Sequence, residues 1–518
     1  MNTADQALFL YAKICSTFNS GYFIDKYIVN IMDQKVQVSS TFPFIPANLE
    51  YLGWESLILV YHLSVNELNS AGIFYGGVGP NYSTNEKIKI YIPESLEKLV
   101  DFFTEKFGEH HDEYLGYMNT GGRSYWCFSQ DGKPASFGIK FGTYSADDSN
   151  MVIRNRYLSE WGINKSAKVS AVLTNEDCVV NESDGAWLEY NDPNSETLSW
   201  KHTFLVRKWK HDLAEIRAHD AIIPFYALLS PNLWSSAEFT KEIGLPVLSS
   251  KKEIKSWIIE QTAPFMVKMI ELGIFKYGYN IEMHQQNITF VVRNQKIVHG
   301  VCQDLQDVCE DPVQRFFNNY KSGARPEEIF TARQYSGALG EFLLQPPRIK
   351  PYGTAASWYR QFIRVLGQYD RCLNVSFDGQ EFVDYEFESE IKNQLLELAK
   401  NKYDINLEQI EIHDLFHCIA NLFREWHKKL VINFEKENNL DFKKSSFTEM
   451  QQITAKGFTY GTSHSPWRFL LITENLHDYD VFKATYQSAE LFLLKKLGSD
   501  VMHFYINAPE PPPTQLDY

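Results

Sequence analysis

The sequence predicts a mixed α/β protein whose strand-rich first part is followed by a mostly helical second part. Short β-type runs alternate with turns from about residue 100 to 300, and a Pro- and Gly-rich stretch then occupies 343–357. The remainder to about residue 505 has mainly helical character. A chain of 518 residues exceeds one simple core, so we expect about two to four domains.

The first part begins with helical stretches and short strands over residues 1–100, among them KIKIYI at 87–92. Polar breaks at SADDSN (145–150) and NDPNSE (191–196) separate the strands that follow. This pattern favours a sheet built of short strands joined by turns.

A long amphipathic helix is predicted over residues 249–273. Ser250 and Glu253 have the spacing of a capping box, which marks the start of a helix. Pro264 is expected to kink this helix, and Gly273 is expected to end it.

A β-hairpin follows this helix. ITFVV (288–292) and KIVHGVC (296–302) are β-rich and flank the short connection RNQ. The polar segment IEMHQQN (281–287) precedes the hairpin, and Asp304 follows it.

The polar segment and Asp304 form a candidate ligand site. In extended backbone, Glu282, His284 and Gln286 would share one face. Asn287 and Asp304 lie at the two ends of one hairpin, where their oxygens could chelate Mg²⁺. The alternative is a solvated polar strand edge, and the residues alone leave both open.

Side chains suited to phosphate occur upstream of the hairpin. They are Thr120, Arg123 and Ser124 in YMNTGGRSYW, Lys140 in SFGIKFGTYS, and Arg154 and Arg156 in NMVIRNRYL. Each could equally lie on a solvated surface, as Lys and Arg usually do.

Charge and composition exclude some classes of protein. The net charge of −15 and pI of about 5.5 argue against general nucleic-acid binding, although a local basic cluster could still hold a nucleotide. The seven cysteines are scattered and include no CxxC pair, which favours a reducing cytoplasm. We find no signal peptide and no apolar run of about 18 residues, so no membrane segment is expected.

In order, these motifs resemble those of the aerobactin-type siderophore synthetases, which work independently of non-ribosomal peptide synthetases (NIS synthetases). NTGGRS, GIKF and SNMVIRNR precede I-E-x-H-x-Q-N, the hairpin and Asp304, so the resemblance covers roughly residues 115–310. The chain departs from the family in two places. It contains no His-Pro dipeptide, which the family's N-terminal motif includes, and Gln303 precedes Asp304 where the family has Arg.

The resemblance implies a cupped-hand architecture. Its N-terminal domain would span 1–110, and a central antiparallel-sheet region that binds ATP and Mg²⁺ would span 111–310. A helical C-terminal domain would span 311–505, before a Pro-rich tail at 506–518. Family members often form homodimers, so a homodimer is expected here.

The resemblance also implies a reaction. ATP would adenylate a citrate-like carboxylate with release of pyrophosphate, and an amine or alcohol would then displace AMP. Such a ligase would serve siderophore biosynthesis and iron acquisition, with small-molecule substrates and with neither nucleic acid nor membrane as a partner.

By the same resemblance, three overlapping groups of residues would form the site. The ATP-binding residues would be Thr120, Arg123, Ser124, Lys140, Arg154, His284 and Asn287. The Mg²⁺ ligands would be Glu282, Asn287 and Asp304. The catalytic residues would be Lys140, Arg154 and His284, which face the α-phosphate and the carboxylate.

Three alternatives remain open. A His, an Asn, a hairpin and an Asp in this order also suit a kinase-like phosphotransferase, although H-R-D, D-F-G and G-x-G-x-x-G motifs are missing. HDLFH (413–417) spaces two histidines for zinc, but it has Asp414 where a zinc hydrolase needs Glu. The third alternative is a non-catalytic relative of the synthetase fold.

Overall fold

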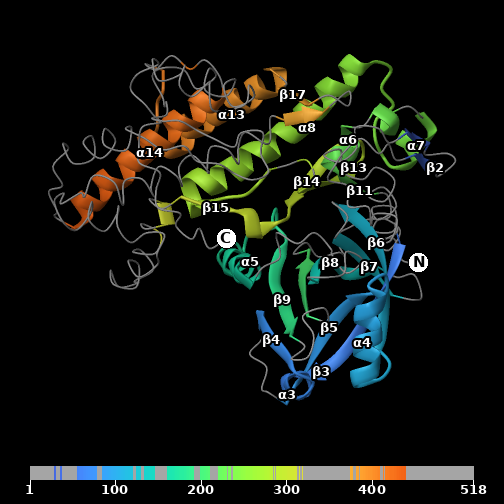
Figure 1. Cartoon of the computed structure of the whole chain (residues 1–518). Helices are drawn as coiled ribbons and strands as arrows, with labels where there is room; N and C mark the ends of the chain where they lie inside the picture. The colour runs from blue at the N-terminus through green and yellow to red at the C-terminus, as the bar shows by residue number, and fades with distance from the viewer. Residues whose placement is uncertain are drawn as a thin grey trace, which may run out of the picture.

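The computed structural model in Figure 1 has two layers, a large curled sheet and a region of long helices, with a short β-hairpin between them. It describes residues 28–30, 35–37, 55–78, 85–120, 124–129, 134–145, 160–191, 199–209, 220–229, 231–234, 237–283, 285, 287–311, 314–315, 318, 374–376, 381–383, 385–408, 412 and 415–438. The predicted mixed α/β class is confirmed.

The large sheet has eight strands, and every neighbouring pair is antiparallel. The strands run in the order β4-β9-β10-β8-β7-β6-β3-β5. Their bounds are β3 Glu55–Ser64, β4 Ile73–Val78, β5 Lys87–Pro93, β6 Asp112–Thr120, β7 Ser124–Phe128, β8 Pro134–Ser145, β9 Asn181–Tyr190 and β10 Trp200–Lys208. The predicted strand at 87–92 is confirmed as β5.

The sheet curls until strands that are not neighbours meet. The rings of Tyr91 on β5 and Phe204 on β10 are 5.3 Å apart. Helix α4 (Glu97–Phe107) contributes Leu99 and Phe103 to the apolar core on this face, and α3 (Val65–Ser70) joins β3 to β4. Helix α5 (Glu160–Val172) lies on the other face, where Ile163 packs against Leu205.

The second layer is built around the three-stranded sheet β11-β13-β14. Its strands are β11 Ala221–Pro224, β13 Ile288–Arg293 and β14 Lys296–Cys302. The helical elements are α6 Phe225–Leu228, η5 Pro231–Trp234, α7 Ala237–Glu242, α8 Lys251–Glu271, η6 Leu272–Tyr277, η7 Leu305–Asp307, α13 Tyr385–Tyr403 and α14 Leu415–Asn438. One apolar core joins residues of α5, α8, the hairpin, α13 and α14.

Three two-stranded pairs complete the described elements. They are β1 Ile28–Asn30 with β2 Lys35–Gln37, β12 Tyr279–Asn280 with β15 Cys309–Glu310, and β16 Asn374–Ser376 with β17 Glu381–Val383. The domain limits given above stay a prediction. In the part of the chain that the structure describes, no helix is both long and apolar enough to cross a membrane.

The local predictions around α8 and the hairpin can be compared directly with the structure. The hairpin is confirmed, and Asn294 and Gln295 both take positive φ at its turn. The capping box at Ser250 is also confirmed. The predicted helix end at Gly273 is wrong.

Helical backbone continues past Gly273 as the π-helix η6 and stops at Gly278, whose φ is 70°. Gly273 lies buried between the buried side chains of Leu272 and Ile274, so packing keeps the helix intact there. A Cβ at Gly278 would come within 2.9 Å of the Gln314 Cβ, so both the left-handed backbone and the close approach require glycine.

Candidate functional site

Backbone pairing brings the end of the hairpin to the large sheet. The chain entering β9 runs parallel to the end of β14: Cys302 N donates to Cys178 O (2.8 Å), and Val180 N donates to Cys302 O (3.0 Å). Below this bridge, α5 packs against η7. Asp304, which follows β14, is therefore held beside the first residues of β9.

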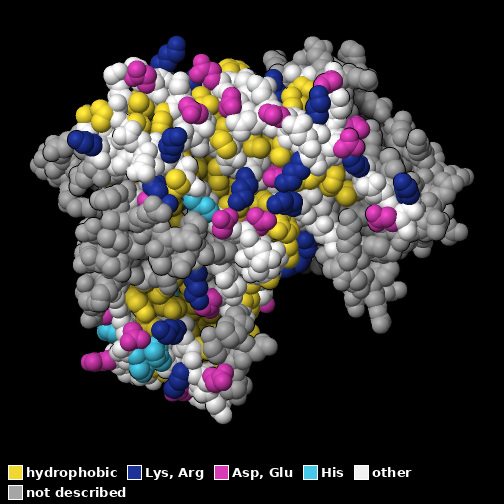
Figure 2. All heavy atoms as spheres, turned by 180° about the vertical axis from the view of Figure 1, so that it is seen from behind, with side chains coloured by type: hydrophobic (Ala, Val, Ile, Leu, Met, Phe, Trp, Pro, Cys, Tyr) yellow, Lys and Arg dark blue, Asp and Glu magenta, His cyan; other side chains and the backbone are white. Residues whose placement is uncertain are grey.

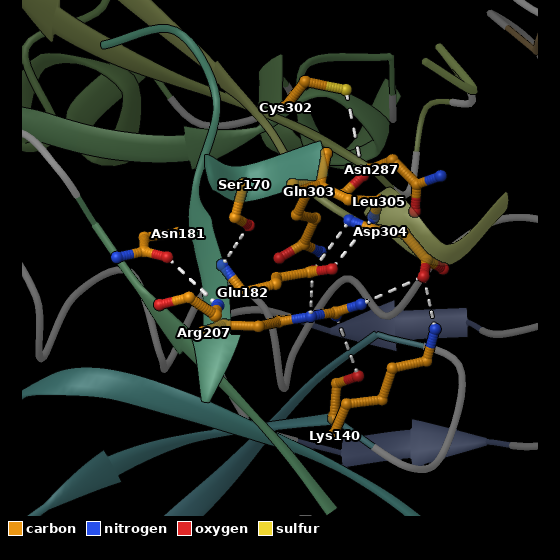
Figure 3. A network of polar contacts seen from close by, with 12 residues as sticks. Lys140, Ser170, Asn181, Glu182, Arg207, Asn287, Cys302, Gln303, Asp304 and Leu305 are labelled. Carbon is orange, nitrogen blue, oxygen red and sulfur yellow. Dashed lines mark hydrogen bonds and ion pairs between the residues drawn. The ribbon is translucent and has the colours of Figure 1, made fainter. Parts of the chain in front are cut away.

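A buried network of charged side chains occupies this junction (Figure 3). Lys140 Nζ lies 2.5 Å from Asp304 Oδ1, and Arg207 NH2 lies 3.2 Å from the same oxygen. Arg207 Nε is 2.8 Å from Glu182 Oε1, and Arg207 NH1 donates to Ser124 Oγ at 3.2 Å. We call Lys140, Glu182, Arg207 and Asp304 the charge network.

Strand register places these side chains on one face of the sheet. Ser124 is paired with Lys140 across β7 and β8, while Arg207 on β10 is paired with Gly138, two residues before Lys140. Residues two apart share a face, so all three polar side chains point the same way. The ladder between β9 and β10 shifts register beside Arg207, and this irregularity brings Glu182 next to it.

Glu182 also fixes the backbone around Asp304. Its two carboxylate oxygens accept from the backbone N–H groups of Asp304 (3.0 Å) and Leu305 (2.9 Å). Asp304 is left-handed, with φ 75° and ψ 60°. Positive φ is uncommon in non-glycine residues, although aspartate and asparagine adopt it more readily than most.

The charge network is unusual in its burial. The exposed fraction of the side chain is 0% for Glu182, 2% for Lys140, 4% for Arg207 and 15% for Asp304. Burying charges is costly, and apolar residues of similar volume are often as stabilising. Two cations, two anions and a serine hydroxyl at a junction between layers therefore form the candidate ligand site.

The polar segment before the hairpin lies next to this network. Asn287 Nδ2 donates to Glu282 O (3.2 Å) and to Glu282 Oε2 (3.5 Å), and Gln303 N donates to Asn287 O (2.8 Å). Figure 3 shows Asn287 beside Asp304. Of Glu282, His284 and Gln286, which were expected to share one face, only Glu282 lies within the described residues, so this expectation stays a prediction.

The donor types of this segment fit Mg²⁺. Glu282 and Asp304 supply carboxylate oxygens and Asn287 an amide, and these are hard ligands. Asp304 Oδ1, however, already contacts two cations, so a metal ion would reach it best together with an anion that takes those cations. Burial raises the pKa of the neighbouring Cys302 thiol well above its usual value, which argues against a cysteine nucleophile.

The structure brings together some of the predicted residues. Ser124, Lys140 and Asp304 meet in and around the charge network, and Glu282 contacts Asn287. Thr120 is paired with Ser124 at the ends of β6 and β7, and nothing is described of its side chain. Arg123, Arg154, Arg156 and His284 lie outside the described residues.

Sequence reasoning missed Glu182 and Arg207. Arg207 ends the otherwise apolar run FLVR, and Glu182 follows the apolar CVV by one residue. For Arg207, a charged residue at the end of a run that predicts a buried strand is the available signal. Glu182 lies in the polar stretch NESDG, which gives no such signal. Lys165 on α5 and Arg315 are further buried cations among the described residues, with 7% and 5% exposed.

A second polar cluster lies at the outer end of the large sheet. His62 pairs with Asp112 (3.0 Å) and His110 with Glu113 (3.2 Å), while the rings of His62 and His111 stack at 5.1 Å. Figure 2 shows histidines gathered on this part of the surface. Within the described residues, no group of three or more His, Cys, Asp or Glu side chains is placed to hold a metal ion. His413 of the HDLFH motif lies outside them.

No family model and no curated protein sequence matches the chain. Solved structures do match it. One is the petrobactin biosynthesis protein AsbB from Bacillus anthracis (12% identity, 84% of this chain and 69% of that one, TM-score 0.37). Another is the aerobactin synthetase IucA from Klebsiella pneumoniae (13% identity, 77% and 72%, TM-score 0.39).

An ATP-bound structure of IucA matches at 12% identity over 76% of this chain and 73% of that one, with a TM-score of 0.38. At TM-scores below 0.5 these matches carry no inference about residues or reaction. Aerobactin synthetases, the family named in the predicted resemblance, are among the solved structures that the chain matches.

Proposed function

We propose that this chain is an ATP-dependent, AMP-forming ligase. A carboxylate oxygen of a small, citrate-like substrate attacks the α-phosphorus of ATP, the bond to the β-phosphate breaks and pyrophosphate leaves. An amine or alcohol then attacks the acyl carbon and releases AMP. The amide or ester formed belongs to siderophore-type biosynthesis.

One observation carries this proposal. Lys140 and Asp304 belong to two different motifs of the resemblance, stand 164 residues apart in the sequence, and lie 2.5 Å apart in the fold. Two motifs that were recognised separately thus meet in one buried place. Ser124, from the third motif, joins them through Arg207.

The proposed chemistry needs this kind of environment. An attacking carboxylate and a triphosphate are both anionic, so their approach is unfavourable unless cations are already in place. Lys140 and Arg207 supply two fixed positive charges where little water competes, with exposed side-chain fractions of 2% and 4%. A nearly dry site strengthens their attraction for phosphate oxygens.

Mg²⁺ belongs to the same proposal. Glu282, Asn287 and Asp304 would hold it, and it would supply further positive charge for the phosphates. Thr120, Arg123 and Ser124 would bind the phosphates, and Arg154 and His284 would contact the α-phosphate and the carboxylate. A cytoplasmic homodimer is the proposed form of the enzyme.

Isotope exchange between ATP and pyrophosphate tests the first half-reaction. The purified protein with Mg²⁺ is given ATP, labelled pyrophosphate and a panel of carboxylates that includes citrate. Exchange with one carboxylate is expected, and Asp304→Asn and Lys140→Met should each lower its rate about 10²–10³-fold, as does the loss of one stabilising group at a transition state. Lys201→Met is the matched control, because it removes one exposed lysine from β10.

The other readings predict different products. Formation of ADP in place of AMP would support a kinase-like phosphotransferase. A protein that binds no ATP would support a non-catalytic relative. Exchange that survives in both site variants would contradict the assignment of the site.

A further inference from the structure

The two cations of the charge network already hold an anion that belongs to the protein. Both contact the same oxygen of Asp304, with Lys140 Nζ at 2.5 Å and Arg207 NH2 at 3.2 Å. A phosphate oxygen that used these cations would need the same position. The Asp304 carboxylate and a bound phosphate therefore exclude one another at Oδ1.

We propose that the Asp304 carboxylate is a displaceable occupant of the Lys140–Arg207 cation pair, and that a polyphosphate ligand enters by releasing it. This inference rests on the proposed function, and it adds Arg207 to the phosphate-binding residues. The ligand class is an inorganic or nucleotide polyphosphate, whose charge replaces that of the carboxylate.

The contacts show why Asp304 is the member that moves. Its side chain is the most exposed of the charge network at 15%, whereas Glu182 is completely buried. Glu182 also pairs with Arg207 Nε and accepts hydrogen bonds from the backbone N–H groups of Asp304 and Leu305. The Asp304 side chain can therefore rotate away while the turn and the guanidinium stay in place.

The charges favour an exchange rather than a simple addition. The network holds two positive and two negative side chains, so its net charge is zero. An anion added to this buried set would bring negative charge that these four side chains do not compensate, and a low dielectric penalises such charge. Release of Asp304 leaves one net positive charge for the ligand, and it frees a carboxylate oxygen for the metal ion that accompanies a nucleotide.

Removal of the Asp304 charge should therefore strengthen polyphosphate binding when no metal is present. The probe is inorganic pyrophosphate, titrated calorimetrically into the full-length protein in the presence of EDTA. Asp304→Asn should bind it about tenfold more tightly than the wild type, because the loss of competition at one charged hydrogen bond changes affinity by about this factor. Asparagine tolerates left-handed backbone, so the turn is retained.

Two further variants sharpen the test. Glu189→Gln removes an exposed carboxylate from β9 and should leave pyrophosphate affinity unchanged, which separates local displacement from a change in overall charge. The double variant Asp304→Asn/Arg207→Met should lose the gain. If Asp304→Asn does not fold, Asp304→Gly gives the same comparison, because glycine adopts positive φ freely.

Equal or weaker pyrophosphate binding by Asp304→Asn would overturn the displacement. The proposed function would survive that result if Mg²⁺-dependent exchange with a carboxylate were present in the wild type. Failure of every variant to bind pyrophosphate would also overturn the displacement. In that case, ATP binding measured with Mg²⁺ in the same samples would decide whether the proposed function falls with it.

Discussion

Strands β8 and β10 present two faces that are both buried but differ in kind. One face carries Lys140 and Arg207, which pair with the carboxylates of Asp304 and Glu182. The opposite face carries Thr143 and His202, which pair with each other across the same two strands. The same backbone thus supports a charged face and a neutral face.

The polar groups of the neutral face find their hydrogen-bond partners within the sheet. His202 Nε2 donates to the backbone oxygen of Tyr91 and Nδ1 accepts from Thr143 Oγ1, both at 2.8 Å. Burial lowers the pKa of His202 to about 4, so the imidazole is neutral at pH 7. These bonds tie β5 to β10 where the sheet curls, which is a structural task.

The charged face has a different relation to stability. Its ions lose hydration that their mutual attraction only partly replaces. A neutral, hydrogen-bonded pair such as His202 with Thr143 would fill the same volume with a smaller loss of hydration free energy. The comparison teaches that burial alone does not mark a site, and that several charged side chains converging in one buried place make a better candidate.

The largest effect expected from this comparison follows the loss of Glu182. Glu182→Ala would leave the Arg207 guanidinium without its closest carboxylate and two backbone N–H groups without their acceptor. We expect the free energy of unfolding to fall by about 3–5 kcal/mol, as when one partner of a buried ion pair is removed. Urea unfolding measures it.

The double variant Glu182→Ala/Arg207→Met supplies the control. It also removes the Arg207 guanidinium charge that Glu182→Ala leaves without its closest carboxylate. The free energy of unfolding of the double variant should therefore exceed that of Glu182→Ala alone. Additive losses would mean that the two side chains do not act as a pair.

The neutral buried state of His202 should make the free energy of unfolding depend on pH. Because the pKa of His202 is about 4 in the folded chain and about 6.5 in the unfolded chain, the unfolded chain binds the extra proton between these values. Stability from this residue is complete above pH 6.5 and is lost as the pH falls toward 4. Between pH 7 and pH 5 the loss should be about 2 kcal/mol.

Urea unfolding at pH 7 and pH 5 would measure this difference. His202→Gln should reduce it, because the titrating group is gone. His111→Gln, which changes a histidine of the surface cluster, should retain the wild-type difference. An unchanged pH dependence in His202→Gln would show that His202 is not the buried neutral group described.

Local elements were predictable because their signals are short. The capping box at Ser250 and the hairpin at 288–302 depend on residues close in sequence. The end of the following helix was not predictable in this way. A glycine such as Gly273 is typical of a helix end, but Gly273 is buried and helical backbone continues to Gly278. Burial depends on the whole fold, which a short segment does not specify.

The same distinction applies to the candidate site. Lys140 and Asp304 could be named from motifs, because each stands in a short pattern. Arg207 and Glu182 stand in no pattern. Their roles depend on the register of β10 against β8, on the irregular pairing of β9, and on the bridge that brings Cys302 to Val179. Such long-range pairing cannot be predicted from any one segment of the sequence.

The smallest expected effect comes from a second ion pair on the same two strands. Lys201 on β10 lies 2.8 Å from Glu189 on β9, the same separation as between Arg207 Nε and Glu182 Oε1. The side chains of Lys201 and Glu189 are 57% and 33% exposed. Water and salt screen such pairs, so a double-mutant cycle of Lys201→Met and Glu189→Gln should give a coupling below about 1 kcal/mol.

A small coupling would indicate that burial, rather than strand pairing, sets the strength of these ion pairs. The two ion pairs join the same two strands at the same separation, but one cation is lysine and the other arginine, and only the Glu182–Arg207 pair is buried. A coupling at Lys201–Glu189 as large as at Glu182–Arg207 would contradict that explanation, because the strand pairing rather than the dry environment would then set the strength of both. A small coupling that weakens further in high salt would leave burial as the reason why the Glu182–Arg207 pair is the stronger of the two.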